Sequence, residues 1–493
     1  MTLFTKNKLM TGDEYIESLR KRKPLKLYLN GEKIKNPVDH PIIKPSINSV
    51  ALTYDLAHDP EHKDLVRTKS VLTGRTINRF NHLHQSIEDL INKVKMLRVL
   101  GQKTGTCFQR CVGMDGFNAV FLTTYEIDQK YGTTYHQRFK DYLVKVEDND
   151  WIVDGCMTDV KGDRSKRPAD QIDPDMYLRV VERKPDGIII RGAKAHQTGA
   201  INSHEILLMP TIAMREEDKD YAVCCSLPAD TEGVIYIYGR QSCDLRKMDE
   251  SETGSIDSGN ACYGGQEALM IFEDVFIPNE NIYMNGEWDF SGMLVESFSG
   301  YHRQSYGGCK VGVGDVMIGA AATIAEYNGC AKASHIKDKI VEMIHLNETL
   351  YSCGIACSAC GKKALAGNYL IDILLANICK QNVTRNPYEI ARLLQDIAGG
   401  LMVTLPSAKD LTNPETKDYM EKYLVGTPGV AIKNKMKLLR LIENMTLGRA
   451  AVGYLTESMH GAGSPQAQRI MISRLSGMEI KKSLAKHLAQ VKE

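Results

Sequence analysis

Residues 301–314, YHRQSYGGCKVGVG, combine two candidate metal ligands with groups that can carry protons. His302 and Cys309 are seven residues apart, so in a helix their side chains lie on one face. Tyr306 and Lys310 lie beside them and could move protons. The glycines of this stretch leave space for another part of the structure to approach the backbone closely. We interpret the stretch as the centre of a candidate site.

A second pair of candidate ligands, Cys107 and Cys111, lies far upstream in the sequence CFQRC. The two thiols are four residues apart, which also places them on one face of a helix. Taken alone, either pair could consist of ordinary core residues, because free cysteine is often buried and a buried histidine is usually hydrogen-bonded. Together they offer four soft or borderline ligands. The sequence therefore predicts that Cys107, Cys111, His302 and Cys309 bind one iron–sulfur cluster.

Three further cysteines form a competing pattern. Cys353, Cys357 and Cys360 have the CxxxCxxC spacing that radical S-adenosylmethionine enzymes use for a cluster. Here they lie in a run that we expect to be helical, LYSCGIACSACGKK, with no strand before it and no alternating strands and helices around it. We therefore interpret these three cysteines as small core residues.

The length and composition indicate an ordinary globular protein. The chain has 493 residues, 43% hydrophobic and 25% charged, with a formal net charge of +1. We expect roughly two to four domains, and no electrostatic attraction to nucleic acid or to an anionic membrane. We find no apolar run of the roughly 18 residues that a membrane helix needs, and the start, MTLFTKNKLM, lacks the apolar core of a signal peptide. These features predict a cytoplasmic protein whose 13 cysteines are thiols or metal ligands.

Residues 1–150 are expected to form a mainly helical N-terminal domain. The sequences TGDE at 11–14 and SIED at 86–89 have the form of capping boxes, which mark the starts of helices. Residues 25–29 and 32–34 flank the pair Asn30-Gly31, a combination that predicts a small hairpin.

The pattern changes twice more along the chain. Residues 151–285 contain short strand-like runs and turns rich in Gly, Pro and Asp without alternating helices, which favours a compact antiparallel β-barrel domain over a parallel sheet. Residues 286–493 are expected to form a C-terminal helical bundle. The predicted fold class is therefore α+β multidomain, in the order helical, β-barrel, helical bundle. The long helices that we expect in the bundle are 311–325, 336–366, 388–397 and 434–459.

Several long strings of the sequence resemble one group of flavoproteins. The order helical, β, helical is the plan of the acyl-CoA dehydrogenase superfamily. The string FEDVFIPNEN at 272–281 resembles the segment that leaves the middle domain in that superfamily, and QDIAGG at 395–400 resembles the stretch with which a neighbouring subunit approaches the FAD pyrophosphate. Essentially the whole chain is similar to the family of 4-hydroxybutyryl-CoA dehydratases, through the strings CFQRCVGMD, MTDVKGDR, GAKAHQTGAINSHE, YHRQSYGGCKVGVGDV and TESMHGAGSPQAQR.

This resemblance implies a homotetramer with FAD and a [4Fe-4S] cluster in each active site, acting on an acyl-CoA. The implied cluster ligands are Cys107, Cys111, His302 and Cys309. The residues implied to line the flavin are Met157, Thr158, Asp159, Lys161, Gly162, Asp163, Arg164, His196, Gln197, Thr198, Gln395, Gly399 and Gly400. The residues implied to act near the substrate are Glu267, His302, Tyr306, Lys310 and Glu457, with Gln109 and Thr198 as supports.

The family dehydrates 4-hydroxybutyryl-CoA to crotonyl-CoA and isomerises vinylacetyl-CoA to the same product. A thioester acidifies the C2 proton but not the C3 proton, and the C4 hydroxyl is a poor leaving group. One-electron transfer to a flavin makes the C3 proton more acidic, and an iron of the cluster can act as a Lewis acid on the hydroxyl. A neutral imidazole can be displaced and then act as a base, so we expect His302 to yield its iron to the substrate. Glu267, Glu457 and Tyr306 compete for the proton-transfer roles.

Two other functions are compatible with parts of the pattern. A flavin-dependent phenol monooxygenase of the same fold needs no iron, so the four candidate ligands argue against it. A non-catalytic flavin and iron–sulfur electron carrier needs no carboxylates or tyrosine near its flavin, so the candidate acid–base residues argue against that function.

Overall fold

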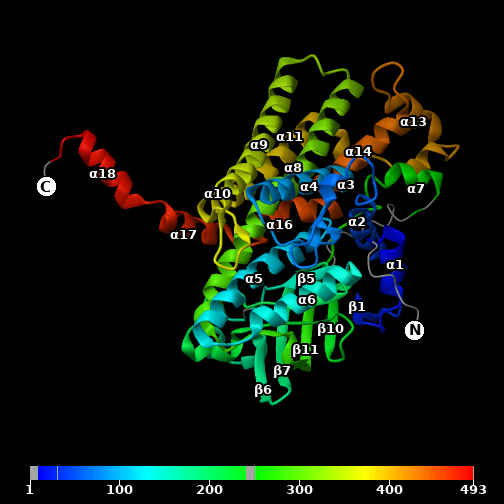
Figure 1. The fold of residues 1–493 in the computed structure, drawn as a ribbon. Helices are drawn as coiled ribbons and strands as arrows, with labels where there is room; N and C mark the ends of the chain where they lie inside the picture. The colour runs from blue at the N-terminus through cyan, green and yellow to red at the C-terminus, as the bar shows by residue number, and fades with distance from the viewer. Residues whose placement is uncertain (1–8, 30, 161, 240–248, 250, 492–493) are drawn as a thin grey trace.

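The structure is a computed structural model that describes residues 9–29, 31–160, 162–239, 249 and 251–491. Along the chain, a first set of helices is followed by strands and then by a second set of helices (Figure 1). This order confirms the expected α+β class. The exact domain division at residues 150 and 285 stays a prediction.

The first set of helices begins with the predicted capping box. The backbone N–H of Glu14 donates to Thr11 Oγ1, and the backbone N–H of Thr11 donates to Glu14 Oε2, so the first turn of α1 satisfies two of its free donors. Ser86 caps α4 by accepting from the backbone N–H of Asp89. The helices of this part are α1 (Gly12–Arg20), α2 (Lys44–Asp55), α3 (Lys63–Val66), α4 (Ile87–Thr104), α5 (Cys111–Tyr131) and α6 (Tyr135–Asn149).

The strands form two larger sheets with mixed pairing. One has the order β2-β1-β10-β11-β7-β6 and the other β12-β9-β8-β5, and the pairs β1–β10 and β5–β8 are parallel. The pairings between described residues give two sheets, and their two parallel pairs depart from the all-antiparallel pairing that we expected; closure into a barrel stays a prediction. The bounds are β1 (Lys26–Leu29), β2 (Glu32–Lys33), β3 (Arg67–Lys69), β4 (Thr76–Asn78), β5 (Val153–Cys156), β6 (Arg179–Lys184), β7 (Gly187–Thr198), β8 (Glu205–Leu208), β9 (Val223–Pro228), β10 (Val234–Gly239), β11 (Glu267–Pro278) and β12 (Ile282–Asn285).

Two contacts connect these sheets to the rest of the chain. The predicted hairpin forms as β1 and β2, with Asn30 outside the described residues, and β1 adds the pair to the edge of the larger sheet beside β10. Asp159, which follows β5 of the smaller sheet, forms a β-bridge with Lys194 of β7 in the larger sheet. The Lys194 ammonium lies 2.9 Å from the Asp159 carboxylate, and both side chains are buried. The two sheets are therefore joined at the segment that follows β5.

The second set of helices differs from the prediction at its ends. The helix expected at 311–325 is much longer, and the one expected at 336–366 ends at Ala359, before the hairpin of β13 (Lys362–Lys363) and β14 (Tyr369–Leu370). The helix expected at 434–459 breaks at Gly448, which is extended, and resumes with the short α15, which a π-helical turn at Val452–Thr456 follows. The helices are α7 (Glu252–Asp257), α8 (Ser291–Tyr327), α9 (Ser334–Ala359), α10 (Ile373–Val383), α11 (Asn386–Ala398), α12 (Leu401–Thr404), α13 (Lys417–Tyr423), α14 (Ile432–Thr446), α15 (Arg449–Ala451), α16 (Glu457–His460), α17 (Pro465–Leu475) and α18 (Met478–Leu488).

Helix α8 is the central element of the molecule. It packs against α4, α5, α9, α10, α11 and α14. The segment Trp288–Tyr327 is long and apolar enough to cross a membrane by length and composition, but most of its apolar window is buried inside the protein. We therefore assign it to the protein core. Glycines permit the closest of these contacts: a Cβ on Gly308 would lie 2.9 Å from the Leu97 Cβ, and one on Gly312 would lie 2.8 Å from the backbone nitrogen of Gln102, both on α4.

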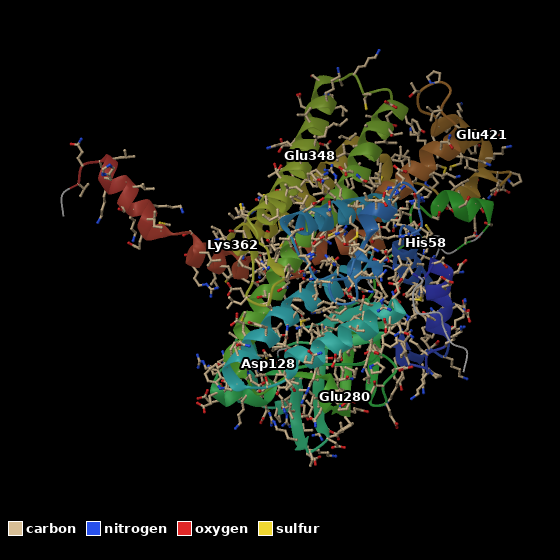
Figure 2. All side chains as sticks on the ribbon, in the orientation of Figure 1. His58, Asp128, Glu280, Glu348, Lys362 and Glu421 are labelled. Carbon is tan, nitrogen blue, oxygen red and sulfur yellow. The ribbon has the colours of Figure 1, made fainter. Side chains whose placement is uncertain are left out.

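The side chains that cover this core are drawn in Figure 2. Glu348, labelled there on α9, forms an ion pair with Arg98 of α4 at 2.5 Å. This contact links α9 to α4. In contrast, α18 extends away from the body of the molecule, beyond α17, which packs against α10 (Figures 1 and 2). The apolar side chains of α18 are exposed, including Leu484 at 59% and Leu488 at 82%.

Candidate active site

The four predicted metal ligands come from two regions of the chain that the helix packing brings together. Cys111 is the first residue of α5, and His302 and Cys309 lie on α8, which packs against α5. The Cys111 sulfur and a ring nitrogen of His302 lie within 4.8 Å of each other and of a carboxylate oxygen of Asp115. A charge on Cys309 would raise the pKa of Cys107 and of Cys111, and a charge on Cys107 would raise that of Cys111, so the three thiols are neighbours.

Cys107 does not share a helix face with Cys111, in contrast to the prediction. It lies in the loop before α5, because Gln109 has a φ of 64° in the left-handed region and so interrupts any helix through this stretch. The buried Gln109 amide holds this conformation, since its Nε2 donates to the backbone oxygens of Ser46 and Gly264 at 3.0 and 2.9 Å. The position of Cys107 in the site is therefore determined by the conformation of this loop and not by helical spacing.

All three thiols are free, and their surroundings suit a positively charged metal centre. Burial, followed by the negative charge of Glu457, raises the pKa of Cys107 well above its usual range, and burial raises the pKa of Cys309 to about 11. These thiols therefore stay protonated unless a cation compensates the thiolate charge. The buried Lys310 is close enough to lower the pKa of Cys107 and of Cys309, and so its charge offsets part of the charge of their thiolates. The donors and their charge balance fit an iron–sulfur cluster core.

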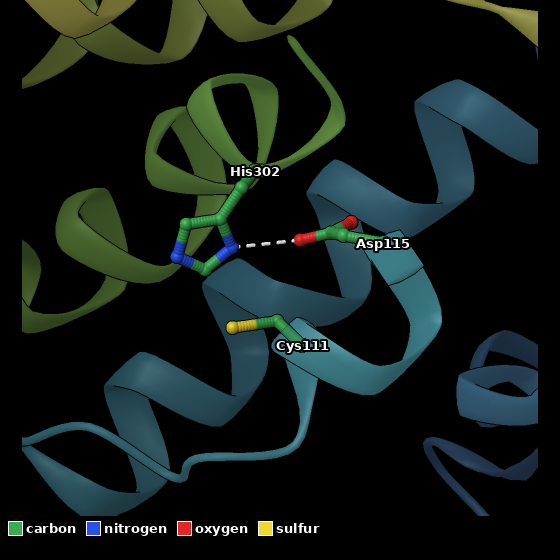
Figure 3. A group of neighbouring side chains, drawn as sticks. All are labelled: Cys111, Asp115 and His302. Carbon is green, nitrogen blue, oxygen red and sulfur yellow. Dashed lines mark hydrogen bonds and ion pairs between the residues drawn. The ribbon is translucent and has the colours of Figure 1, made fainter. Parts of the chain in front are cut away.

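His302 is held by contacts on both sides of its ring. One ring nitrogen, Nδ1, lies 2.8 Å from Asp115 Oδ2, as Figure 3 shows. Phe298 stacks on the imidazole with ring centroids 5.8 Å apart, and Tyr306 meets it edge-on at 5.1 Å. Burial alone would raise the pKa of Asp115, but the charge of Lys93 and the hydrogen bond with His302 outweigh it, so this pKa is lowered.

Glu457 faces the cysteines from the C-terminal part of the chain. It begins α16 directly after the π-helical turn, and its Oε1 lies 3.9 Å from the Cys107 sulfur. Its Oε2 accepts from Lys310 Nζ at 3.0 Å, and the same ammonium donates to the backbone oxygen of Gly453. Burial lowers the pKa of Lys310, but the charges of Glu457 and of the cysteines raise it by more. Lys310 therefore stays charged and holds Glu457 as an ion pair.

Glu267 provides a second carboxyl group with a different environment. It lies at the start of β11, and its Oε2 accepts from Thr198 Oγ1 at 2.6 Å. Burial, and then the negative charge of Glu457, raises the pKa of Glu267 well above its usual range. The site therefore contains one carboxyl group whose surroundings favour the protonated form and one that is ion-paired, which is the arrangement that separates a proton donor from an acceptor.

The Tyr306 hydroxyl is buried and, among the residues that the structure describes, has no hydrogen-bond partner. Two ammonium groups lie over its ring, Lys310 at 5.0 Å and Lys380 at 4.7 Å from the centroid. Lys380 also donates to the backbone oxygen of Ser458, and burial, together with the charge of Lys310, lowers its pKa to about 7. A buried hydroxyl without a partner is costly, so a ligand that accepts from it would relieve this cost.

Three residues of this site were not identified from the sequence, namely Asp115, Lys93 and Lys380. Asp115 follows Cys111 by four residues in the string CFQRCVGMD, so its position on the same helix face was a usable signal. Lys93 and Lys380 are the other two, and no local pattern distinguishes them from surface lysines. Both are fully buried in the structure.

Two of the predicted flavin segments lie side by side. The backbone oxygen of Thr158 accepts from the backbone N–H of Ala195 at 2.8 Å and from Gln197 Nε2 at 3.0 Å. His196 has a φ of 57°, which turns the strand just before Thr198. This group contains Met157, Thr158, Asp159, Gly162, Asp163, Arg164, His196, Gln197 and Thr198, whereas Lys161 lies outside the described residues. Its hydroxyl, amide and guanidinium donors suit a polar cofactor.

The third predicted flavin segment is in another part of the molecule. Gln395 lies near the end of α11, and Gly399 and Gly400 follow it at the surface. Helix α11 packs against α8, α9 and α14, at the end of the molecule opposite the strands (Figure 1). The structure of one chain therefore does not bring Gln395, Gly399 and Gly400 to the other flavin residues.

Of the three competing cysteines, which we expected in the core, Cys357 is buried, Cys353 is half-buried and Cys360 is exposed. Cys353, Cys357 and the C-cap Cys360 all belong to α9 or its end. Cys357 is buried and donates to the backbone oxygen of Gly354, and Cys353 accepts from Asn382 at 3.6 Å. In the part of the chain that the structure describes, none of them belongs to a group of three neighbouring metal-ligating side chains.

Nearly the whole chain is similar to known proteins. The family models "4-hydroxyphenylacetate 3-hydroxylase N terminal" and "C terminal" match residues 11–284 and 291–490. A 4-hydroxybutyryl-CoA dehydratase/vinylacetyl-CoA-Delta-isomerase from Clostridium aminobutyricum is 62% identical over 98% of this chain and 100% of its own length. A 4-hydroxyphenylacetate 3-monooxygenase oxygenase component from Thermus thermophilus is 24% identical over 89% of this chain and 88% of its own length.

Solved structures agree with these matches. An oxygen-tolerant archaeal 4-hydroxybutyryl-CoA dehydratase from N. maritimus superposes with a TM-score of 0.96 at 59% identity, over 99% of this chain and 96% of that one. The oxygenase component of 4-hydroxyphenylacetate 3-monooxygenase, complexed with FAD and 4-hydroxyphenylacetate, has a TM-score of 0.87 at 22% identity and 98% coverage of both chains, which shows a shared fold. The chain therefore belongs to the 4-hydroxyphenylacetate 3-hydroxylase family and, within it, to the family of 4-hydroxybutyryl-CoA dehydratases.

Proposed function

We propose that this chain dehydrates 4-hydroxybutyryl-CoA to crotonyl-CoA and isomerises vinylacetyl-CoA to the same product, using FAD and a [4Fe-4S] cluster. The name of the relative at 62% identity supports both reactions. The observation that carries the proposal is that Cys111 and His302 lie within 4.8 Å of each other, with Cys107 and Cys309 as neighbours, beside two carboxyl groups in different environments. A phenol monooxygenase has no use for such a set of ligands.

The cluster would be held by these three cysteines and His302, and the flavin would lie against the segments that contain Thr158 and Gln197. When bound, the iron supplies a Lewis acid for the leaving hydroxyl, and FAD supplies one-electron chemistry that makes the C3 proton acidic. The protein positions the imidazole of His302 among the thiols, and imidazole is the ligand of the four that can leave as a neutral base.

The proton transfers follow from the stoichiometry. Dehydration removes protons from C2 and C3, returns one proton to C4 and gives one to the departing hydroxyl. Isomerisation of vinylacetyl-CoA needs only the removal of the C2 proton and the delivery of a proton to C4. We assign the C2 proton to Glu457, which Lys310 holds in an ion pair, and the delivery to Glu267, whose raised pKa keeps it protonated. One pair of carboxyl groups thereby explains why a single site performs both reactions.

Tyr306 and Lys310 are suited to hold the substrate. The buried Tyr306 hydroxyl lacks a partner among the described residues, so it can donate to an oxygen of the acyl group. The ring is fixed between Lys310 and Lys380, which limits the directions in which the hydroxyl can point. Lys310 can keep Glu457 in place while the carboxylate changes its protonation state.

The flavin site is proposed to be completed by a neighbouring subunit in a homotetramer. Gln395, Gly399 and Gly400 lie at the surface, away from the segments with Thr158 and Gln197, so a second copy would have to supply them. The exposed apolar side chains of α18 also support self-association, because an isolated helix of this length is marginal in water without packing. We further propose that the enzyme works in the cytoplasm, where its free thiols stay reduced.

The test is to purify the full chain without oxygen and to measure iron, acid-labile sulfide and flavin per chain, together with crotonyl-CoA formation from each substrate. We expect one [4Fe-4S] cluster and one FAD per chain, and both reactions. Flavin without iron in protected protein, with hydroxylation of a phenol and no crotonyl-CoA, would overturn the proposal in favour of the monooxygenase. Isomerisation without dehydration would retain the role of the carboxyl groups and remove that of the iron.

A further inference from the structure

We propose that Asp115 and Lys93 form a buried positioning pair that determines which nitrogen of His302 is available to bind iron. This inference rests on the proposed function, because it requires His302 to be a cluster ligand. It assigns a role to two residues that lie behind the ligand and do not touch the substrate. Asp115 is on α5 and Lys93 is on α4, whereas His302 is on α8, so the pair connects three helices behind the cluster.

The contacts form a continuous buried chain. Lys93 Nζ donates to Asp115 Oδ1 at 2.5 Å, and Asp115 Oδ2 lies 2.8 Å from His302 Nδ1. The hydroxyl of Ser305 donates to the same Asp115 oxygen at 3.1 Å. The side chains of Lys93 and Asp115 are both completely buried, and that of His302 is 7% exposed.

The charge of Lys93 determines the direction of the hydrogen bond to His302. A carboxylate that is paired with an ammonium group can only accept hydrogen bonds, so the hydrogen between Asp115 and His302 must be on Nδ1. In a neutral imidazole the other nitrogen, Nε2, then carries the lone pair. Figure 3 shows Nε2 pointing away from Asp115. The atom that can bind iron is therefore selected by the contact on the opposite side of the ring.

The same contact would serve after the imidazole leaves the iron. A detached histidine that kept its Nδ1–H on Asp115 would still have its lone pair on Nε2, at the side of the ring where the iron was. It could then accept a proton without rotation of the ring or exchange of its tautomer. Asp115 would thus preserve the ring orientation in both states, as partners of metal-bound histidines generally do.

Lys93 contributes more than charge. Besides Asp115, its ammonium donates at 3.0 Å to the backbone oxygen of Tyr301 and at 3.0 Å to Gln304 Oε1, the residues on either side of the His302 turn of α8. All three ammonium hydrogens are thereby used. Lys93 therefore fixes Asp115 relative to the backbone that carries His302, which sets the distance between the carboxylate and the ring.

A purely structural ion pair is the alternative explanation, and the chain contains a matched control. Arg440 and Asp257 form a pair at 2.9 Å, each side chain 4% exposed, in the C-terminal helical part. Asp257 accepts further hydrogen bonds from Ser407 and from the backbone of Ala408, as a structural carboxylate does. Its loss should lower stability without changing the ligands of the cluster.

The experiment compares Asp115→Asn with Asp257→Asn in the full chain, labelled with ¹⁵N-histidine and purified without oxygen. In Asp115→Asn the amide gives its oxygen to Lys93 and its N–H to His302, so Nδ1 must accept and Nε2 carries the hydrogen. We expect the histidine nitrogen coupling in the ENDOR spectrum of the reduced cluster to disappear, and iron to be lost to a chelator roughly 10- to 100-fold more readily. Asp257→Asn should retain the coupling and the iron.

The outcomes separate this inference from the proposed function. A native nitrogen coupling in Asp115→Asn would overturn the positioning role and leave the cluster in place. If the unsubstituted protein itself lacked histidine coupling, the ligand role of His302 would fail, and the positioning role with it. If Asp115→Asn takes up no cluster, Lys93→Met provides the test. We expect this variant to show a weaker histidine coupling than the native protein and to lose iron to a chelator more readily. Native values for both the coupling and the iron loss would overturn the inference.

Discussion

The metal half and the flavin half of the candidate site are built in different ways. The four predicted cluster ligands converge within one chain, on a loop and two helices that pack against each other. Of the three predicted flavin segments, two lie together beside β7, whereas the third, which contains Gln395 and Gly400, follows a helix at the other end of the molecule. All four candidate cluster ligands therefore come from a single chain, and we propose that the flavin half depends on assembly.

This difference reflects what surrounds each half. The ligands on α8 are fixed by core packing, in which close glycine contacts leave little freedom. The flavin segments are strand ends and surface loops, whose positions depend on what they contact. A substitution in the metal half should therefore remove iron and spare flavin, and a substitution at Gly400 should do the reverse.

The largest effect is expected for Cys107→Ala. Without this ligand the remaining donors cannot complete a cluster, so dehydration should fall by roughly 1,000-fold or more, because the Lewis acid contributes several kcal/mol. Flavin should remain, since Cys107 belongs to none of the three flavin segments. The measurement is iron, sulfide and flavin per chain, with crotonyl-CoA formation. Cys353→Ala on α9 is the matched control and should keep its iron; dehydration at the native rate by an iron-free Cys107→Ala protein would contradict the metal half.

The next effect is expected for Gly400→Glu. Nothing lies within 4 Å of the position that its Cβ would occupy, and its φ of −61° suits any residue, so one chain tolerates the change. In the assembled enzyme the new carboxylate would face the phosphates of a neighbour's FAD and weaken its binding roughly 10- to 100-fold. Flavin titration of the deflavinated protein measures this.

Iron content should stay unchanged in that variant. Gly319→Glu serves as its control, because Gly319 is an exposed glycine of α8 that also has open space around it. Equal flavin affinities of the two variants would show that Gly400 does not approach a flavin.

A smaller effect concerns the pH dependence of stability. The pKa of Glu267 is raised in the folded state, so the folded protein holds a proton that the unfolded chain releases above its ordinary pKa. Stability should therefore fall as pH rises, by up to about 1.4 kcal/mol per pH unit for this group. Glu267→Gln should remove that part of the slope in urea unfolding from about pH 5 to pH 8. Glu273→Gln on the same strand changes an exposed carboxylate and should leave the slope as it was; the same slope in Glu267→Gln would refute the shift.

The smallest effect is expected for Thr11→Ala, outside both halves. It removes the side-chain cap of α1 and should cost about 1 kcal/mol of stability. Iron, flavin and both reactions should be unaffected, and urea unfolding at one pH measures the change. A change in iron or flavin content would show that stability alone alters the site, and the first two variants would then need to be compared at equal stability.

The residues differ in how far the sequence could predict their positions. The pair His302 and Cys309 was predictable because both lie in one uninterrupted helix, where spacing determines the face. Cys107 was not, since the left-handed backbone of Gln109 depends on distant partners, Ser46 and Gly264. The positions of Lys93 and Lys380 could not be predicted either, because their burial comes from tertiary packing.

The fold shows a similar pattern. The order of helical and β parts was predictable from residue patterns, and the capping box at Thr11 was correct. The parallel pairing of β1 was not predictable, because its partner lies about 200 residues away in the sequence, at β10, and no local pattern encodes that pairing. The early end of α9 and the break in the helix before Glu457 were also missed, since single glycines such as Gly448 are tolerated in many helices.

The uninterrupted course of α8 has a consequence for how such sequences can change over evolution. His302, Tyr306, Cys309 and Lys310 occupy successive turns of this one helix. Each residue added to or removed from an α-helix turns everything beyond it by about 100° and shifts it by about 1.5 Å. A one-residue insertion or deletion between His302 and Lys310 would point the tyrosine, the cysteine and the lysine in new directions together. Lineages that keep the chemistry should therefore vary in length in their surface loops while the spacing within this helix stays constant.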